Sequence, residues 1–504
     1  MKFRGLTVSV LLLLIVLSSA FAPGKKYSRT YVTNYENVLG TSFQMKVVAI
    51  STSAADEAEA KAMAEIDRLN KILSGYDKLS EFSKWQHGEK RPTKVSPELY
   101  EVMALFDEWQ KKSQGALDAS AEVVGNVWKD AAKRNTIPTA ADLAVAVKTV
   151  KQPHWQLNEA NHTALHLDDA PLMLNSFVKS YIMNKACDVA LATGNISAIV
   201  MNIGGDIVLK GDHQEQILVA NPKADAENDA PISKLLLNNK AIATSGNYRR
   251  GELINGQWYS HIVDPRTGMP ADKVISATVV SDNATDAGAL ATAFNVLSPD
   301  ESKALAATIP HTEFMLITSN GKRVESNGWS ALEMKPVAPT KTVNVLPADK
   351  TWDPNYELVV GLELNQIEGM RVHRPYIAIW VVDKDKKPVR SLALWYGKTK
   401  YLNEMSAWYD AYANKFYDSD QSVSSTTSAT RPAGKYTIKW DGKDDKGNLV
   451  KLGTYSIKIE AAREHGTHQL MTQELDFTKP QKPVDLPGNV EIAGATINYV
   501  KKSN

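Results

Sequence analysis

Three glycine-bearing stretches decide the fold: MNIGGD at residues 201–206, ATSGNY at 243–248 and HIVDPRTGMP at 261–270. Each combines residues typical of a β-strand with a turn that contains glycine. Glycine adopts positive φ angles readily and carries no side chain, so the backbone there can approach a ligand closely. The neighbouring Asn, Ser, Thr and amide groups can donate hydrogen bonds to phosphate oxygens. Each stretch alone is more often a tight turn, and only their combination indicates a binding site.

The composition is that of an ordinary globular protein. The 504 residues include 58 Lys and Arg against 57 Asp and Glu, and 43% are hydrophobic. This balance provides neither the basic surface of a nucleic-acid-binding protein nor the high net charge of a disordered chain. At roughly 150 residues per domain, the length predicts two to four domains. The single cysteine, Cys187, excludes an intrachain disulfide and a thiolate cluster for zinc or iron–sulfur.

The first 22 residues have the organisation of a secretory signal peptide. Lys2 and Arg4 precede an apolar run at residues 10–17, and small residues at 18–22 offer a cleavage site. The run is shorter than the roughly 20 apolar residues of a membrane span, and no later segment approaches that length. We therefore expect a soluble periplasmic or extracytoplasmic protein, with an uncleaved signal acting as an anchor as the alternative. Because no cysteine lies near the signal, the chain is not expected to be a lipoprotein.

Residues 31–330 are predicted to form an α+β domain. Apolar residues at helical spacing predict helices at residues 53–73, 97–113, 140–150, 178–192 and 286–297. β-branched residues and alternation predict strands within 31–50 and at 198–203, 207–210, 217–220, 276–280 and 313–318. Because helices and strands do not alternate regularly, we expect an α+β arrangement rather than a doubly wound sheet.

Beyond this domain the character of the sequence changes. Residues 331–348 are rich in Pro, Thr and Val and predict a semi-rigid linker. Residues 349–478 contain short β-rich runs separated by Asp-Gly and Lys-Gly-Asn turns, which is typical of a smaller all-β sandwich of the Ig-like kind. The predicted strands of this second domain lie at 376–382, 391–396, 434–441 and 453–460. Residues 479–504 are then expected to be a tail.

The three glycine-bearing stretches, in this order, resemble the ApbE-like FAD:protein FMN transferase family. The resemblance covers residues 31–329 and includes LGTS at 39–42, EIDRLN at 65–70, YD at 76–77, GALD at 115–118, KSY at 179–181 and ALATA at 289–293. Members of this family are extracytoplasmic enzymes that attach FMN covalently to a threonine of a partner protein. The resemblance therefore implies a flavin transferase domain that uses FAD as its substrate.

The resemblance also implies which residues hold FAD. They are the positions that match the family's binding residues, together with the glycine-bearing turns: Leu39, Tyr76, Ala116, Leu117, Asp118, Lys179, Gly204, Gly205, Thr244, Ser245 and Val263. The ring of Tyr76 can stack on a flavin or adenine, and Lys179 can offset the charge of the pyrophosphate. His261 is the predicted acceptor of the threonine proton, because imidazole titrates near neutrality, with Lys179 as the second catalytic residue. The alternative for His261 is that it only positions phosphate or shapes its loop.

Splitting the pyrophosphate of FAD is served by a hard cation, and the resemblance implies Mg²⁺. Ser176 and Thr292 match two of the family's metal contacts. Gly288 stands where the family has an aspartate, and Met173 where it has a second acidic residue. Asp286 is the predicted replacement ligand, although two residues along a regular helix correspond to about 200° of rotation. These departures weaken the expectation of catalysis more than that of flavin binding.

The second domain resembles the small Ig-like domain found beside flavin transferases, and it contains a candidate flavin acceptor. TSAT at residues 427–430 is similar to the acceptor motif of the partners of these transferases, with Ser428 for a glycine and Ser424 for an aspartate. Thr430 is therefore a candidate site for covalent FMN, and a tethered acceptor has a high effective concentration. The alternative interpretation is a flexible polar loop.

These patterns predict a Mg²⁺-dependent transferase that moves FMN from FAD to a threonine of an extracytoplasmic protein and releases AMP. The expected acceptor is a redox protein or the chain's own C-terminal domain, and no nucleic acid is involved. Either Asp286 or Asp282 has replaced the lost metal ligand, or the activity is altered. The alternatives are a non-catalytic flavin-binding or electron-transfer protein on the same fold, and an FAD hydrolase that yields FMN and AMP.

Overall fold

The structure is a computed structural model of the chain. It describes residues 28–248, 250–335, 351–366, 374–418, 427–428, 430–463, 466–479 and 481–502. The predicted signal peptide at residues 1–22 and most of the predicted linker, from residue 336 onward, lie outside the described residues.

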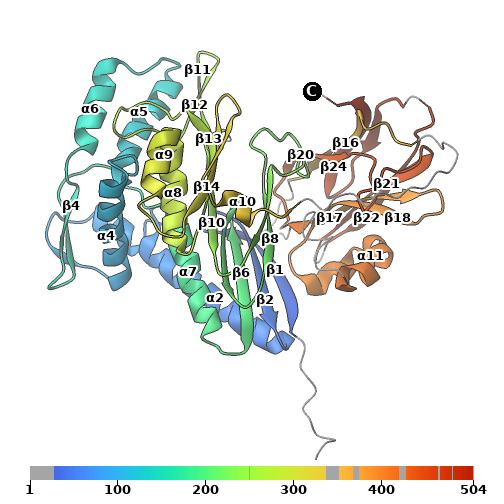
Figure 1. Ribbon diagram of the computed structural model, residues 1–504, viewed down its shortest axis with the longest axis horizontal. Coiled ribbons are helices and arrows are strands. Elements are labelled where there is room, and N and C mark those ends of the chain that lie inside the picture. The colour runs from blue at the N-terminus through green and yellow to red at the C-terminus, as the bar shows by residue number, and fades with distance from the viewer. Residues whose placement is uncertain are drawn as a thin grey trace, which may run out of the picture.

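An eight-stranded antiparallel sheet forms the centre of the first domain (Figure 1). Its strand order is β1-β2-β6-β7-β10-β13-β14-β15. The strands are β1 (Arg29–Val38), β2 (Thr41–Ala49), β6 (Ile196–Ile203), β7 (Asp206–Gly211), β10 (Ala241–Gly246), β13 (Val274–Ser281), β14 (Glu313–Thr318) and β15 (Arg323–Glu325). Two of the glycine-bearing stretches belong to neighbouring strands of this sheet, so their turns lie close together.

One face of the sheet is covered by the helices α2 (Thr52–Leu73), α7 (Val178–Leu191) and α8 (Ala284–Val296). Helix α2 begins after Ser51, whose hydroxyl accepts a hydrogen bond from the backbone N–H of Ala54. Its buried residues recur every three or four positions, the stripe that an amphipathic helix presents to a core. Helix α8 is buried along most of its length because it packs against β10 and β13 of the sheet and against α7 beside it. The predicted α+β class is confirmed.

The opposite face of the sheet packs on a smaller layer. It consists of β8 (Glu215–Val219), β9 (Ser233–Leu237) and α10 (Trp329–Leu332), whose Trp329 is completely buried among the aliphatic side chains of this layer. The remaining elements of the domain are α3 (Glu81–Gln86), β3 (Thr93–Lys94), α4 (Pro97–Lys112), η2 (Ala119–Ala121), β4 (Trp155–Asn158), β5 (Thr163–His166) and α9 (Pro299–Ala306).

A lobe at one end of the sheet carries the third glycine-bearing stretch. It is built from α5 (Glu122–Lys133), α6 (Ala140–Val150) and the hairpin of β11 (Gly251–Ile254) and β12 (Gln257–Ser260). Trp128, Ile254 and Val263 are buried in its own small core. The indole N–H of Trp128 donates to the carbonyl of Gly268 at 2.8 Å, so the loop after β12 is fixed to helix α5.

The second domain is a sandwich of two sheets, with strand orders β20-β16-β24-β23 and β19-β18-β17-β21-β22. The strands are β16 (Tyr356–Leu364), β17 (Tyr376–Asp383), β18 (Pro388–Trp395), β19 (Thr427–Ser428), β20 (Gly434–Trp440), β21 (Thr454–Ala462), β22 (His468–Asp476), β23 (Val484–Pro487) and β24 (Ile492–Lys501). Trp352, Trp395 and Trp440 lie in the core between the sheets. The predicted all-β sandwich is confirmed, and a 3₁₀ helix η3 (Thr399–Glu404) and a helix α11 (Ser406–Asp418) pack on the outer face of β17 and β18.

The prediction of a tail at residues 479–504 is wrong. Strand β24 pairs along its length with β16 in the middle of a sheet, and β23 pairs with β24 at the edge. Ile492, Ala495 and Ile497 are buried in the sandwich core. The second domain therefore continues to residue 501, and its last strand is as central to the sheet as any other.

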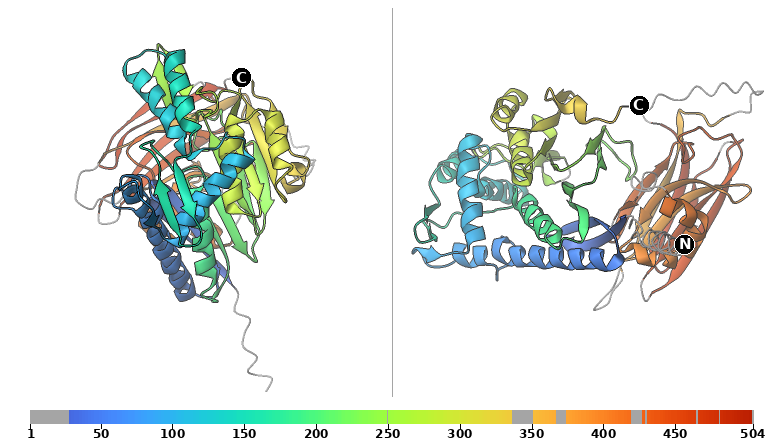
Figure 2. Two further views of the ribbon diagram at one scale, coloured as in Figure 1. Left: turned by 90° about the vertical axis from the view of Figure 1, so that its left-hand side faces the viewer. Right: turned by 60° about the horizontal axis from the view of Figure 1, so that its bottom comes forward.

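The two domains contact each other along the edge strand β1 (Figure 2). Thr33 and Lys398 form an isolated antiparallel bridge, and the backbone N–H of Asn34 donates to the carbonyl of Gly397 at 2.6 Å. This pairing satisfies backbone groups that an edge strand otherwise exposes. Within the described residues, we find no helix whose length and apolar character would suffice to span a membrane.

Candidate functional site

A cleft of about 970 Å³ opens at the end of the sheet where the glycine-bearing turns lie. Its walls come from the β1–β2 turn, the β6–β7 turn, the end of β10, the start of α7, one side of α8 and the lobe with β11 and β12. Most of the predicted site residues line it: Leu39, Tyr76, Ala116, Leu117, Asp118, Ser176, Lys179, Gly204, Thr244, Ser245, His261, Val263 and Thr292. Gly205 and Asp286 do not.

The β1–β2 and β6–β7 turns touch each other at the mouth of the cleft. Gly204 and Gly205 have φ angles of 62° and 101°, in the region that favours glycine. A Cβ atom on Gly204 would lie 2.9 Å from Cγ2 of Thr41, so a side chain at that position would push the turns apart. The packing of the two turns therefore requires glycine at position 204, and the exposed backbone of Gly204 becomes part of the cleft wall.

Tyr76 and Asp118 differ in what they offer a ligand. The side chain of Tyr76 is mostly exposed, and its hydroxyl accepts a hydrogen bond from the amide of Asn175 at 3.2 Å, so its ring is accessible for stacking. The carboxylate of Asp118 accepts hydrogen bonds from Gln110 at 2.6 Å and from the backbone N–H of Ser120 at 2.7 Å. Asp118 therefore already serves to cap the short helix η2, and it shapes the wall of the cleft.

His261 lines the cleft and keeps one ring nitrogen that can accept a proton. Its Nδ1 lies 3.0 Å from the carbonyl oxygen of Arg250, which can only accept, so Nδ1 carries the hydrogen and Nε2 has the lone pair. Partial burial lowers the pKa of His261, the hydrogen bond to that carbonyl opposes this, and the charges of Arg250 and Lys129 lower the pKa further. A neutral imidazole at pH 7 is the form that a general base requires.

Asp206, the residue that ends the MNIGGD stretch, lines the cleft beside Lys179. Its Oδ2 accepts a hydrogen bond from the hydroxyl of Ser180 at 3.3 Å, and the backbone N–H of Thr244 also donates to it. Burial raises the pKa of Asp206 to about 6, although the charge of Lys179 and these hydrogen bonds act in the opposite direction. Sequence reasoning used the two glycines of the stretch and missed this carboxylate, although it follows them directly.

Two of the predicted metal ligands lie together and the third does not. The hydroxyl of Thr292 donates to the carbonyl oxygen of Ser176 at 3.1 Å, so these two oxygens share one part of the cleft wall. Asp286 lies instead on the side of α8 that faces Lys112 and Glu108 of α4, as its 200° separation from position 288 predicts. The expectation that Asp286 joins Ser176 and Thr292 is thus not met, because the start of α8 is regular.

Burial raises the pKa of Asp286, with the nearby charge of Lys112 opposing the shift. Asp282, the other alternative, pairs with Lys240 outside the cleft. Among the described residues, no group of three or more His, Cys, Asp or Glu side chains is arranged to hold a metal ion.

The predicted acceptor Thr430 lies at the contact between the domains. Its hydroxyl donates to Oε1 of Glu36 at 2.6 Å, and Arg374 pairs with the other oxygen of the same carboxylate. Thr430 is 6% exposed and is not among the cleft-lining residues. Glu36 directly precedes Asn37, which does line the cleft, so Thr430 is held close to the rim. Of the other motif positions, Thr427 and Ser428 form the short strand β19, whereas Ser424 and Ala429 lie outside the described residues.

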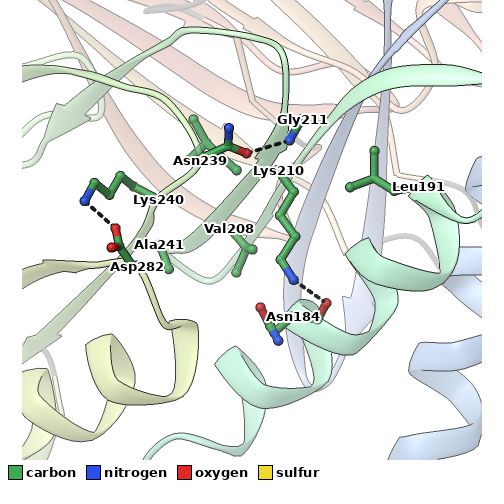
Figure 3. Close-up of a pocket in the computed structure, with 10 residues that line it drawn as sticks. Asn184, Leu191, Val208, Lys210, Gly211, Asn239, Lys240, Ala241 and Asp282 are labelled. Carbon is green, nitrogen blue, oxygen red and sulfur yellow. Dashed lines mark hydrogen bonds and ion pairs between the residues drawn. The ribbon is translucent and has the colours of Figure 1, made fainter. Parts of the chain in front are cut away.

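A second, smaller cavity of about 250 Å³ lies between α7, β7, the start of β10 and the neighbouring turns (Figure 3). Two lysines line it, and both are paired: Lys210 pairs with Asp188 at 2.5 Å, and Lys240 pairs with Asp282, as Figure 3 shows. Because each cation already has a carboxylate partner, this cavity offers an anion little unbalanced charge. The larger cleft is therefore the candidate functional site.

Comparison with known proteins finds matches to both domains of the chain. The model of the ApbE family matches residues 39–316, and the model of a predicted periplasmic protein family, DUF2271, matches residues 357–494. An FAD:protein FMN transferase of Klebsiella pneumoniae is 27% identical over 312 residues, which cover 60% of this chain and 88% of that protein. An FAD:protein FMN transferase of Vibrio cholerae is 29% identical over 281 residues, with coverage of 53% and 82%.

Solved structures show the same fold. The ApbE protein of Thermotoga maritima superimposes with a TM-score of 0.54 at 23% identity, covering 61% of this chain and all of that one. The flavin transferase ApbE of Vibrio cholerae gives a TM-score of 0.51 at 22% identity, with coverage of 60% and 99%. Because the family model spans more than half of the 504 residues and contains nearly the whole cleft, the chain belongs to the ApbE family.

Proposed function

We propose that this protein transfers FMN from FAD to a threonine of an acceptor protein and releases AMP. Relatives with this activity by name are similar to this chain over 281 to 312 residues, and the family model matches residues 39–316, which contain nearly all of the cleft. The observation that carries the proposal is the common cleft of His261, Lys179 and the glycine turn at Gly204, which places a base, a cation and accessible backbone around one ligand-sized volume.

The chemistry assigns a separate task to each of these groups. The oxygen of the acceptor threonine attacks the phosphorus on the FMN side of the pyrophosphate, and its proton passes to Nε2 of His261. The bond from that phosphorus to the bridging oxygen breaks, and AMP leaves with the oxygen. Lys179 offsets the negative charge of the phosphates. Because Nδ1 of His261 donates to the carbonyl of Arg250, Nε2 is the ring nitrogen that is left to take the proton.

Mg²⁺ is the cation that this proposal assigns to the site. A bound cation would neutralise charge that develops on the phosphate oxygens. The carbonyl of Ser176 and the hydroxyl of Thr292 are hard oxygen donors of the kind that Mg²⁺ prefers, and they already lie side by side. Gly288 and Met173 stand where the family has acidic residues, and this favours a second candidate function, that of a protein that binds flavin at this cleft without turnover.

The proposed location is the periplasm or another extracytoplasmic compartment. It is supported by the sequence of the first 22 residues and by the family of predicted periplasmic proteins that matches the second domain. The acceptor is a redox protein there or the second domain itself through Thr430. Modification of Thr430 requires that its contact with Glu36 opens, because the hydroxyl is buried in that contact.

The test is incubation of the full chain with FAD, Mg²⁺ and candidate acceptors, followed by measurement of AMP and of fluorescent acceptor. His261→Gln is expected to slow transfer by about 10²- to 10⁴-fold and to leave FAD binding in place, because it removes a base and no binding charge. His87→Gln, on the exposed end of α3, is the matched control and should behave as wild type.

Three outcomes separate the alternatives. Labelled acceptor with AMP supports the transferase, AMP and soluble FMN without labelled acceptor indicates a hydrolase, and bound FAD with neither product indicates the flavin-binding protein. Equal transfer rates for His261→Gln and wild type would contradict the role given to His261.

A further inference from the structure

The side of α8 that faces the cleft lacks a carboxylate at Gly288, and the structure shows what fills its place. A Cβ atom on Gly288 would lie 2.7 Å from the hydroxyl oxygen of Ser180 and 3.2 Å from Cα of Phe177. Both neighbours belong to the start of α7 or the residue before it. The side chain of Ser180 thus occupies the space into which a side chain at position 288 would project.

The same hydroxyl leads directly to a carboxylate. Ser180 donates to Oδ2 of Asp206 at 3.3 Å, and Asp206 lines the cleft together with Ser176, Gly288 and Thr292. Thr292 lies one helical turn after Gly288 on the same side of α8. The start of α7, the cleft side of α8 and the first residue of β7 therefore meet at one place.

The other carboxylates that line the cleft are engaged elsewhere or belong to another wall. Asp118 accepts hydrogen bonds from Gln110 and Ser120, Glu122 pairs with Lys129, and Asp77 accepts from the backbone N–H of Leu79. Glu252 belongs to the hairpin that carries His261. Asp206 accepts one side-chain hydrogen bond, from the hydroxyl of Ser180 at the long distance of 3.3 Å, and one from the backbone N–H of Thr244.

We propose that Asp206 is the acidic oxygen ligand of a divalent cation in this cleft, with the carbonyl of Ser176 and the hydroxyl of Thr292 as its neutral ligands. This inference rests on the proposed function. The donor set fits a magnesium site, which typically combines one or two carboxylates with substrate phosphate oxygens and water. The carboxylate that α8 lacks at Gly288 is supplied from β7, and Ser180 holds it in place.

The test measures cation binding apart from catalysis. Mn²⁺ serves as the probe for the full chain with FAD present, and electron paramagnetic resonance reports the unbound Mn²⁺. Asp206→Asn is expected to weaken Mn²⁺ binding at least 10-fold and to change FAD binding without metal by less than 3-fold. Asp286→Asn, which changes the rival carboxylate on α8, is expected to bind Mn²⁺ as wild type does.

Three results would each overturn the inference. Asp206→Asn could bind Mn²⁺ as tightly as wild type does, Asp286→Asn could lose Mn²⁺ binding, or the wild type could fail to bind Mn²⁺ in the presence of FAD. Failure of the proposed function gives a different pattern, namely absence of AMP and labelled acceptor whatever the cation affinity.

A second experiment tests whether a carboxylate at position 288 of α8 can replace that of Asp206. In the Asp206→Asn background, adding Gly288→Asp together with Ser180→Gly is expected to restore Mn²⁺ binding. A carboxylate then stands on α8 and the shortest contact of its Cβ atom, at 2.7 Å to the Ser180 hydroxyl, is gone, which leaves the contacts with Phe177 at 3.2 Å for a small shift to relieve. Adding Gly288→Asp alone is expected not to restore it, because the Ser180 hydroxyl still occupies that space. Equal restoration with and without Ser180→Gly would show that Ser180 does not block a side chain at position 288. Absence of restoration in the triple variant would show that carboxylates at positions 206 and 288 do not serve the same cation site.

Discussion

Asp206 in the cleft and Glu59 at the domain contact are two partly enclosed carboxylates with opposite surroundings. Glu59, on α2, accepts hydrogen bonds from Thr33 at 2.7 Å, from Lys398 at 2.8 Å and from the hydroxyl of Tyr35. Asp206 accepts a hydrogen bond of 3.3 Å from Ser180 and one from a backbone N–H. Glu59 therefore links the two domains through hydrogen bonds from three side chains. Asp206 faces the cleft and has a hydrogen bond from only one side chain and one backbone N–H.

The difference shows in how each carboxylate ionises. Burial by itself raises the pKa of Glu59, but the hydrogen bonds from Lys398, Tyr35 and Thr33 and the charge of Lys398 outweigh it, so the pKa is lowered overall. At Asp206 burial prevails, and the pKa rises to about 6. A carboxylate with satisfied partners contributes to stability, whereas one without them costs stability and is available to a ligand.

Removal of Glu59 is expected to have the largest effect on stability. Glu59→Ala leaves Lys398 without its carboxylate partner and should lower the free energy of unfolding by about 2–3 kcal/mol. Urea denaturation followed by tryptophan fluorescence measures the change. Glu57→Ala, on the exposed side of the same helix, is the control and should stay within about 0.5 kcal/mol of wild type. If Glu59→Ala and Glu57→Ala lower the free energy of unfolding equally, the contacts of Glu59 with Lys398 contribute no particular stability.

Asp206→Asn should change stability in the opposite direction. Without cation or FAD, replacing the enclosed charge by a neutral amide of similar shape is expected to raise the free energy of unfolding at pH 7 by about 1 kcal/mol. The same urea measurement applies. If Asp206→Asn instead lowers the free energy of unfolding by more than about 1 kcal/mol, Asp206 stabilises the fold as Glu59 does, and the two carboxylates do not differ in this respect.

Thr430→Ala tests the second carboxylate of the domain contact, Glu36. Loss of the hydrogen bond from the threonine hydroxyl is expected to cost about 1 kcal/mol. Limited proteolysis at the domain boundary and urea denaturation measure the cost, with Thr472→Ala on the exposed side of β22 as the control. If Thr430 is also the acceptor, intact-mass spectrometry will show added FMN on the wild type that this variant lacks. Absence of that mass from FAD-supplied wild type would refute modification of Thr430.

The smallest expected effect is a pH dependence of the domain contact. Because the pKa of Glu59 in the folded protein lies below its ordinary value of 4.5, its stabilising contribution is fully present above pH 4.5 and is lost as the pH falls through the lowered value. Glu59→Ala should therefore lose less stability than wild type when the pH falls from 5 to 3, and urea denaturation at each pH measures this difference. Parallel pH profiles for the two proteins would contradict the assigned sign.

The sequence predicted those parts of the fold and site that depend on local pattern. Apolar spacing predicted α2 and α8, and the glycines at 204 and 205 predicted a turn at the cleft. The contact of Ser180 with Gly288 could not be predicted, because it depends on the packing of α7 against α8 rather than on either segment alone. The aromatic-rich helix α11 and the pairing of β24 with β16 were missed for the same reason.

The proposed function requires that the cleft bind FAD and that its FMN portion pass to a threonine. The most direct measurement mixes the full chain, FAD, Mg²⁺ and a threonine-containing acceptor, and follows AMP release together with the mass of the acceptor. We expect one AMP for each FMN attached, with both products formed about 10²- to 10⁴-fold more slowly by His261→Gln. FAD that neither binds nor reacts under these conditions, with or without Mg²⁺, would contradict it.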